Sequence, residues 1–153
     1  MNRLLIFSVV LLSMFTFASC SSKPNNDPES IYGNKVRPDW QEVKSEDISV
    51  SMTAVVKVDL TKSYSQASDV SVVTSDVLAA FAGSQCCGIA NPIDGLFYLY
   101  ISDPKGEQKM ITLRYYSSVL KNIFYSEDSF VFVNESRQGN VNEPFVPTFV
   151  VEK

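Results

Sequence analysis

The chain has 153 residues, a formal net charge of −4 and no histidine. An acidic chain has no electrostatic reason to bind nucleic acid, so we expect no nucleic-acid partner. The lack of histidine excludes Ser-His-Asp and Cys-His catalysis and most zinc sites. We therefore predict a protein that is not an enzyme and has no cofactor and no metal. An enzyme that uses carboxylates alone stays open, because such pairs meet only in the fold.

The first residues have the layout of a signal peptide. Arg3 precedes an apolar stretch, Leu4–Phe17, that is shorter than the roughly 20 residues of a transmembrane helix. Residues 17–20 (FASC) resemble the lipobox of bacterial lipoproteins, whose cysteine becomes the first mature residue and is acylated, typically with palmitate. The alternative is a plain signal peptide with an incidental cysteine. We predict a signal peptide at 1–19 and a lipid on Cys20 that anchors the protein in the cell envelope, at the outer membrane.

The segment after the cysteine is poor in apolar residues. Residues 21–38 contain three prolines and three asparagines, and such a segment cannot bury enough surface to order itself. We predict a flexible tether over 20–38, including the lipidated cysteine, and one folded domain over 39–153.

The domain sequence predicts strands. Residues 51–60 alternate between apolar and polar, with only Val55 breaking the polar side, as in a half-buried strand. Residues 61–75 are rich in serine and predict a loop, with a short strand at 70–73 as an option. Residues 77–82 and 85–90 flank Gly83 and Ser84, which predicts a tight hairpin at the centre of the sheet.

A second hairpin is predicted around residues 103–106 (DPKG), whose order fits a type I turn. In that register Leu99 faces Ile111 and Phe97 faces Leu113, so the apolar faces of the two strands agree. Further strands are expected at 120–125, 130–133 and 145–151, the last at a sheet edge because it contains Pro147. About seven or eight short strands predict an all-β fold, a single antiparallel β-sandwich of immunoglobulin-like type.

Part of this pattern resembles a known kind of domain. Residues 76–83 (DVLAAFAG) and 86–90 (CCGIA) resemble a segment of β-sandwich domains in secreted proteins and lipoproteins of Bacteroidetes-type bacteria. Similar features follow at 96–101, 106–116 and 132–144, so the resemblance covers about residues 48–150. Cys87 departs from the pattern, which usually has arginine there, so any role of that arginine is absent. The resemblance implies the sandwich fold and no established catalytic activity.

Two groups of side chains are candidates for function. In the predicted second hairpin Tyr98, Tyr100, Arg114 and Tyr116 share one face, which forms either an aromatic platform for a sugar or protein, or a face packed inside the domain. Cys86 and Cys87 are either a redox-active pair or two small buried apolar residues. We favour the latter, because neighbours on a strand point to opposite faces.

The combined features predict a cell-envelope lipoprotein with a binding or structural module that acts in adhesion or a surface assembly. The alternative is a glycan-binding lipoprotein that assists a polysaccharide-uptake system. The expected partners are the membrane, through the lipid on Cys20, and a protein or glycan at the cell surface.

Overall fold

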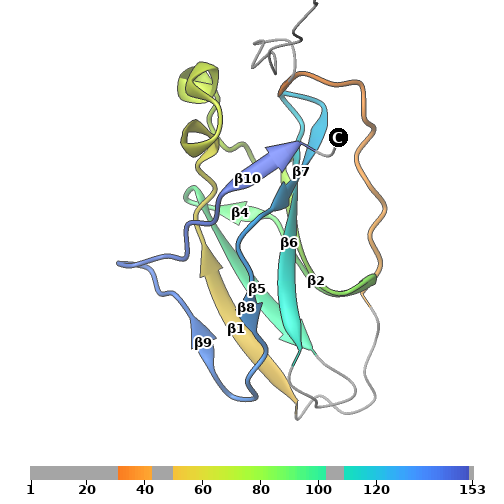
Figure 1. The fold of residues 1–153 in the computed structure, drawn as a ribbon, viewed down its shortest axis with the longest axis vertical. Coiled ribbons are helices and arrows are strands. Elements are labelled where there is room, and N and C mark those ends of the chain that lie inside the picture. Colours follow the sequence, from red (N-terminus) through yellow and green to blue (C-terminus); the bar gives the residue numbers. More distant parts are fainter. Residues whose placement is uncertain (1–30, 43–49, 103–108, 152–153) are drawn as a thin grey trace, which may run out of the picture.

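The computed structural model describes residues 31–42, 50–102 and 109–151, which form an all-β fold of two sheets that face each other (Figure 1). Sheet A has, in order, β4 (Pro92–Ile93), β5 (Leu96–Ser102), β1 (Ser51–Val56) and β9 (Arg137–Gln138). Sheet B has, in order, β10 (Phe149–Val151), β7 (Asn122–Ser126), β6 (Met110–Ser117), β2 (Val77–Ala82) and β3 (Gln85–Ala90), with β8 (Phe130–Val131) also beside β6. All strand pairs are antiparallel except β1 with β9.

The core lies between the two sheets, and its residues follow the period-two pattern of the sequence. Alternate side chains of β1, β5 and β6 point inward and are buried: Met52, Ala54, Val56, Phe97, Leu99, Ile101, Ile111, Leu113 and Tyr115. Full burial of a large aliphatic or aromatic side chain contributes about 1.5–3 kcal/mol to the free energy of folding. These inward-facing residues are therefore a main source of stability. The predicted half-buried strand at 51–60 is confirmed for β1. It is followed by a short 3-10 helix, η2 (Leu60–Lys62).

The predicted hairpin between residues 96–101 and 109–113 is wrong. β5 pairs with β1, so Leu99 lies opposite Ala54, whereas β6 pairs with β2, so Leu113 lies opposite Ala80. The two strands belong to different sheets and meet only across the core. Matching apolar faces arise in both arrangements, and for this reason the alternation alone could not distinguish them. The turn at 103–106 lies outside the described residues.

The predicted hairpin of β2 and β3 is confirmed, with Gly83 at a φ of 63° in the turn. Phe81 lies opposite Cys86 as expected, but a β-bulge places Gly88, not Cys87, opposite Ala80. The hairpin is not central, because β3 forms an edge of sheet B. Both faces of the hairpin are nevertheless apolar, because a second layer packs against the face that points away from the core.

That second layer is residues 31–42, here called the N-terminal strap, which runs along the outer side of sheet B (orange in Figure 1). The amides of Gly33 and Lys35 donate hydrogen bonds of 2.9 and 2.8 Å to the carbonyls of residues 120 and 121, and Ile31 is 1% exposed. At its other end, Trp40 contacts the Phe81 ring edge-to-face. The folded part therefore includes residue 31, and the domain boundary expected at 39 is too late.

The remaining elements agree in part with the predictions. Residues 61–75 contain η2 and a second 3-10 helix, η3 (Ser65–Asp69), and the optional strand at 70–73 is absent there. Strands predicted at 120–125 and 130–133 correspond to β7 and β8, and β10 forms a sheet edge after Pro147, as expected. The described residues hold ten strands, more than the seven or eight that the sequence predicts. The very short β4 and β9 account for the difference.

Within the described residues, no helix has the length and apolar character that are needed to cross a membrane.

Candidate functional site

The four predicted site residues do not share one face. Tyr98 and Tyr100 project from β5 on the outer side of sheet A, where they are 41% and 51% exposed. Arg114 and Tyr116 belong to β6 and lie on the outer side of sheet B. The predicted platform is therefore wrong as a group of four, because it depended on pairing β5 with β6.

Arg114 and Tyr116 are packed against neighbouring parts of the domain. The guanidinium carbon of Arg114 lies 3.9 Å from the centre of the Phe81 ring and 5.3 Å from that of Tyr125. Tyr116 is 6% exposed, and its hydroxyl donates a 3.3 Å hydrogen bond to the carbonyl of Lys35 in the strap. Tyr116 thereby holds the strap against sheet B, whereas Arg114 packs against aromatic side chains of the neighbouring strands β2 and β7.

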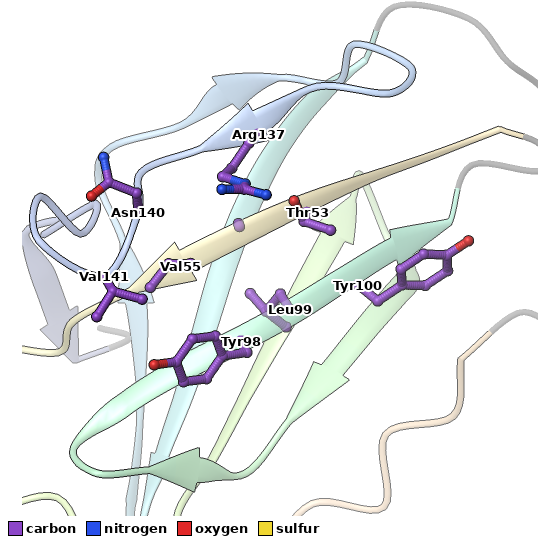
Figure 2. A pocket seen from close by; sticks show the side chains of 9 residues that line it. Thr53, Val55, Tyr98, Leu99, Tyr100, Arg137, Asn140 and Val141 are labelled. Atoms are coloured by element: carbon purple, nitrogen blue, oxygen red, sulfur yellow. The ribbon is translucent and has the colours of Figure 1, made fainter.

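Tyr98 and Tyr100 instead face a hollow on the outer side of sheet A (Figure 2). The register places Tyr100 opposite Thr53, and Thr53 opposite Arg137 on β9. Neighbouring strands are about 4.8 Å apart, so the backbones of Tyr100 and Arg137 are separated by about 10 Å. The short side chain of Thr53 between two long ones leaves this part of the surface open.

Tyr100, Thr53 and Arg137 form one row of side chains across the hollow, and a second, apolar row lies beside it. Tyr98 lies opposite Val55, and Val141 reaches over the same end from the loop after β9 (Figure 2). The whole hollow has a volume of about 370 Å³, within the range of small-molecule sites. It is lined by Thr53, Ala54, Val55, Tyr98, Leu99, Tyr100, Arg137, Asn140 and Val141.

The loop after β9 is fixed against β1. Gly139 has a φ of 68°, and a Cβ atom there would lie 2.8 Å from the carbonyl oxygen of Val55, so only glycine fits. Oδ1 of Asn140 accepts hydrogen bonds of 2.9 and 3.0 Å from the amides of Asn142 and Glu143. These contacts place the loop side chains over the hollow without any binding partner, which lowers the entropy cost of recognition.

The hollow is rich in hydrogen-bond donors. No carboxylate lines it, and the guanidinium of Arg137 makes no hydrogen bond or ion pair within the described part of the chain. The hydroxyl of Thr53 adds a further donor, and Asn140 is also among the lining residues. The arrangement suits a ligand that has acceptor oxygens and an apolar face. Among the described residues, the lining contains no cysteine or serine.

Within the described residues Cys86 and Cys87 form no disulfide, and they are buried on opposite faces of β3. The sulfur of Cys87 is in the core and donates a 3.4 Å hydrogen bond to the carbonyl of Ala80. Cys86 packs with Phe81 under the strap, and burial raises the pKa of its thiol. The burial of the two thiols on opposite faces and the raised pKa of Cys86 support the interpretation that they are small buried residues and not a redox pair. The alternation of side chains along a strand predicts this arrangement.

Sequence reasoning missed Arg137 and Asn140. They lie in and after a two-residue strand, which is too short to show any alternation. For this face the sequence offered only the polar side of residues 51–60, which includes Thr53, and the tyrosines of residues 96–101.

Comparison of the chain with family models, with curated proteins and with solved structures finds no match. The similarity to Bacteroidetes-type domains therefore stays a prediction. Cys20 and the predicted signal peptide at 1–19 lie outside the described residues.

Proposed function

We propose that this protein is a lipoprotein of the cell envelope, anchored through a lipid on Cys20, whose domain is a non-enzymatic binding module. We propose further that the domain is an immunoglobulin-like sandwich related to those of Bacteroidetes-type lipoproteins. The basic, apolar and small-residue order of residues 1–20 supports the anchor. The two facing sheets are compatible with the sandwich.

The difference between the two outer faces supports a binding role. The strap covers part of the outer side of sheet B, whereas Tyr98 and Tyr100 stay exposed beside the hollow on sheet A. Tyrosine and arginine are enriched in binding hot spots, because they offer large contact areas with polar ends. The hollow on sheet A is thus the surface on which a binding partner in the cell envelope would be recognised.

The anchor is tested by replacing Cys20 with alanine. We expect Cys20→Ala to leave the membrane fraction or to remain unprocessed, because an acyl chain contributes about 0.8 kcal/mol for each buried methylene. Protein that stays with membranes at the wild-type level and size would refute the lipid anchor.

The binding face is tested with Tyr98→Ala and Tyr100→Ala in cells that display each variant at equal density. Attachment to surfaces coated with a glycan array or a panel of extracellular proteins should fall by tenfold or more, since hot-spot truncation typically costs about 2 kcal/mol. Tyr32→Ala is the matched control, because Tyr32 is at least as exposed as Tyr98 and Tyr100 but lies on the strap. Equal attachment of all three variants and the wild type would refute this face as the binding surface.

A second candidate is glycan capture beside a polysaccharide-uptake system. The tyrosine rings next to hydrogen-bond donors favour it, since a sugar ring presents an apolar face and a rim of hydroxyl groups. Binding confined to the glycan surfaces in the same assay would select this candidate, and binding confined to proteins would exclude it.

A further inference from the structure

The charge of the hollow is opposite to that of the chain. The full sequence has a net charge of −4, yet among the described residues the only ionisable groups that line the hollow are the tyrosine hydroxyls and the guanidinium of Arg137. Arg137 is exposed and forms no side-chain hydrogen bond or ion pair in the described regions. An arginine without an internal partner is available to pair with an anionic group, and its planar fork matches the two oxygens of a carboxylate or sulfate.

The apolar side of the hollow limits the ligand further. Tyr98, Val55 and Val141 form the row beside that of Tyr100, Thr53 and Arg137 (Figure 2). A small inorganic anion would use only Arg137 and leave the apolar row uncovered. A ligand that fills both rows needs an apolar face next to its anionic group.

We propose that the hollow binds an acidic saccharide, a sugar chain that carries carboxylate or sulfate groups. The apolar face of a sugar ring lies against a tyrosine ring, and its anionic group pairs with Arg137. The amide nitrogen of Asn140 and the hydroxyl of Thr53 donate to the remaining oxygens. This inference rests on the proposed function and adds the class of ligand.

The experiment measures binding by calorimetry with two pairs of probes. Oligogalacturonate is compared with its methyl ester, and a carrageenan oligosaccharide is compared with its desulfated form. Each pair keeps the sugar rings and removes the charge, and together the pairs separate a carboxylate from a sulfate. We expect at least one acidic probe to bind ten or more times tighter than its uncharged partner, with an affinity that falls as salt is raised.

Arg137→Gln should remove that preference and the salt dependence while leaving the melting temperature unchanged, because Arg137 is exposed and unpaired within the described residues. Lys35→Gln is the matched control, since it removes one positive charge from the strap on the other face of the domain. An equal effect of both substitutions would show attraction to general charge only and would overturn the inference.

Two further outcomes would also overturn it. Equal binding of the acidic and uncharged probes would refute the role of Arg137 but leave the proposed function intact. If no acidic probe binds, the inference fails, and the attachment assay with Tyr98→Ala and Tyr100→Ala still decides the proposed function independently.

Discussion

The hydroxyl of Tyr115 donates a 2.6 Å hydrogen bond to Oδ2 of Asp76, and both residues are buried in the domain. Oδ2 also accepts a bond from the amide of Val73, whereas Oδ1 accepts bonds of 2.8 Å from the amide and the hydroxyl of Ser118. One carboxylate thereby joins the residue before β2 to the end of β6. Hydrogen bonds to a charged group contribute about 1.5–3 kcal/mol each, so this contact stabilises one end of the β2–β6 pair in sheet B.

The first prediction concerns alkaline pH. Burial, together with the hydrogen bond to Asp76 and its charge, raises the pKa of Tyr115 above the ordinary value of about 10. The folded protein therefore keeps this proton when the unfolded chain loses it. The contribution to stability is complete below pH 10 and is lost as the pH rises above it.

Urea unfolding at pH 8 and pH 11 measures this effect. We expect the wild type to lose about 1 kcal/mol more than Tyr115→Phe between the two pH values, because phenylalanine has no proton to lose. All other residues are the same in the two proteins, so their contributions cancel in the comparison. Equal losses in the two proteins would contradict the prediction.

The second prediction concerns Gly88, where β3 approaches β5 most closely. A Cβ atom on Gly88 would lie 2.6 Å from the carbonyl oxygen of Tyr100, so one of the strands must shift. We expect Gly88→Ala to lower the free energy of unfolding by about 2–3 kcal/mol, as overpacking does.

Gly83→Ala serves as the comparison, because a Cβ atom there meets nothing within 4 Å. Its cost is the backbone strain of a positive φ alone, about 1–2 kcal/mol. A smaller loss for Gly88→Ala than for Gly83→Ala, by urea unfolding, would show that the two strands separate without difficulty.

The third prediction places the start of the folded part. Ile31 is buried in the core although it belongs to the region predicted as a tether. Ile31→Ala should destabilise the protein by about 2–4 kcal/mol because it leaves a cavity. Val36→Ala is the control, since Val36 is 86% exposed and its loss should change the stability by less than about 0.5 kcal/mol. If the two variants unfold at the same urea concentration, the strap does not contribute to the fold.

The fourth prediction concerns the thiols. Burial keeps Cys86 and Cys87 away from solvent, and the raised pKa of Cys86 lowers its thiolate fraction. Peptide mapping by mass spectrometry should find both residues unmodified after iodoacetamide treatment of the native protein, and both alkylated after unfolding in urea. A disulfide between them, or rapid alkylation in the native protein, would contradict the structure.

The sequence by itself determined the local structure of this domain. Alternation marked β1, a continuous apolar run marked β5, and Gly83 marked the turn between β2 and β3, because side-chain pattern and backbone freedom are local properties. It also identified Tyr98 and Tyr100 as candidates. The alternation of β5 gave them the face opposite to Phe97 and Leu99, and that face is exposed.

Only the tertiary structure decided which strands are neighbours and which faces are covered. The inward residues of β5 match those of β6 as well as those of β1, so local pattern could not assign β5 to sheet A. That assignment separates Tyr100 from Arg114 and brings it near Arg137, which lies in a strand that forms only through its contact with β1. Strand pairing depends on contacts between residues far apart in the chain, and the period of a single strand contains no information about them.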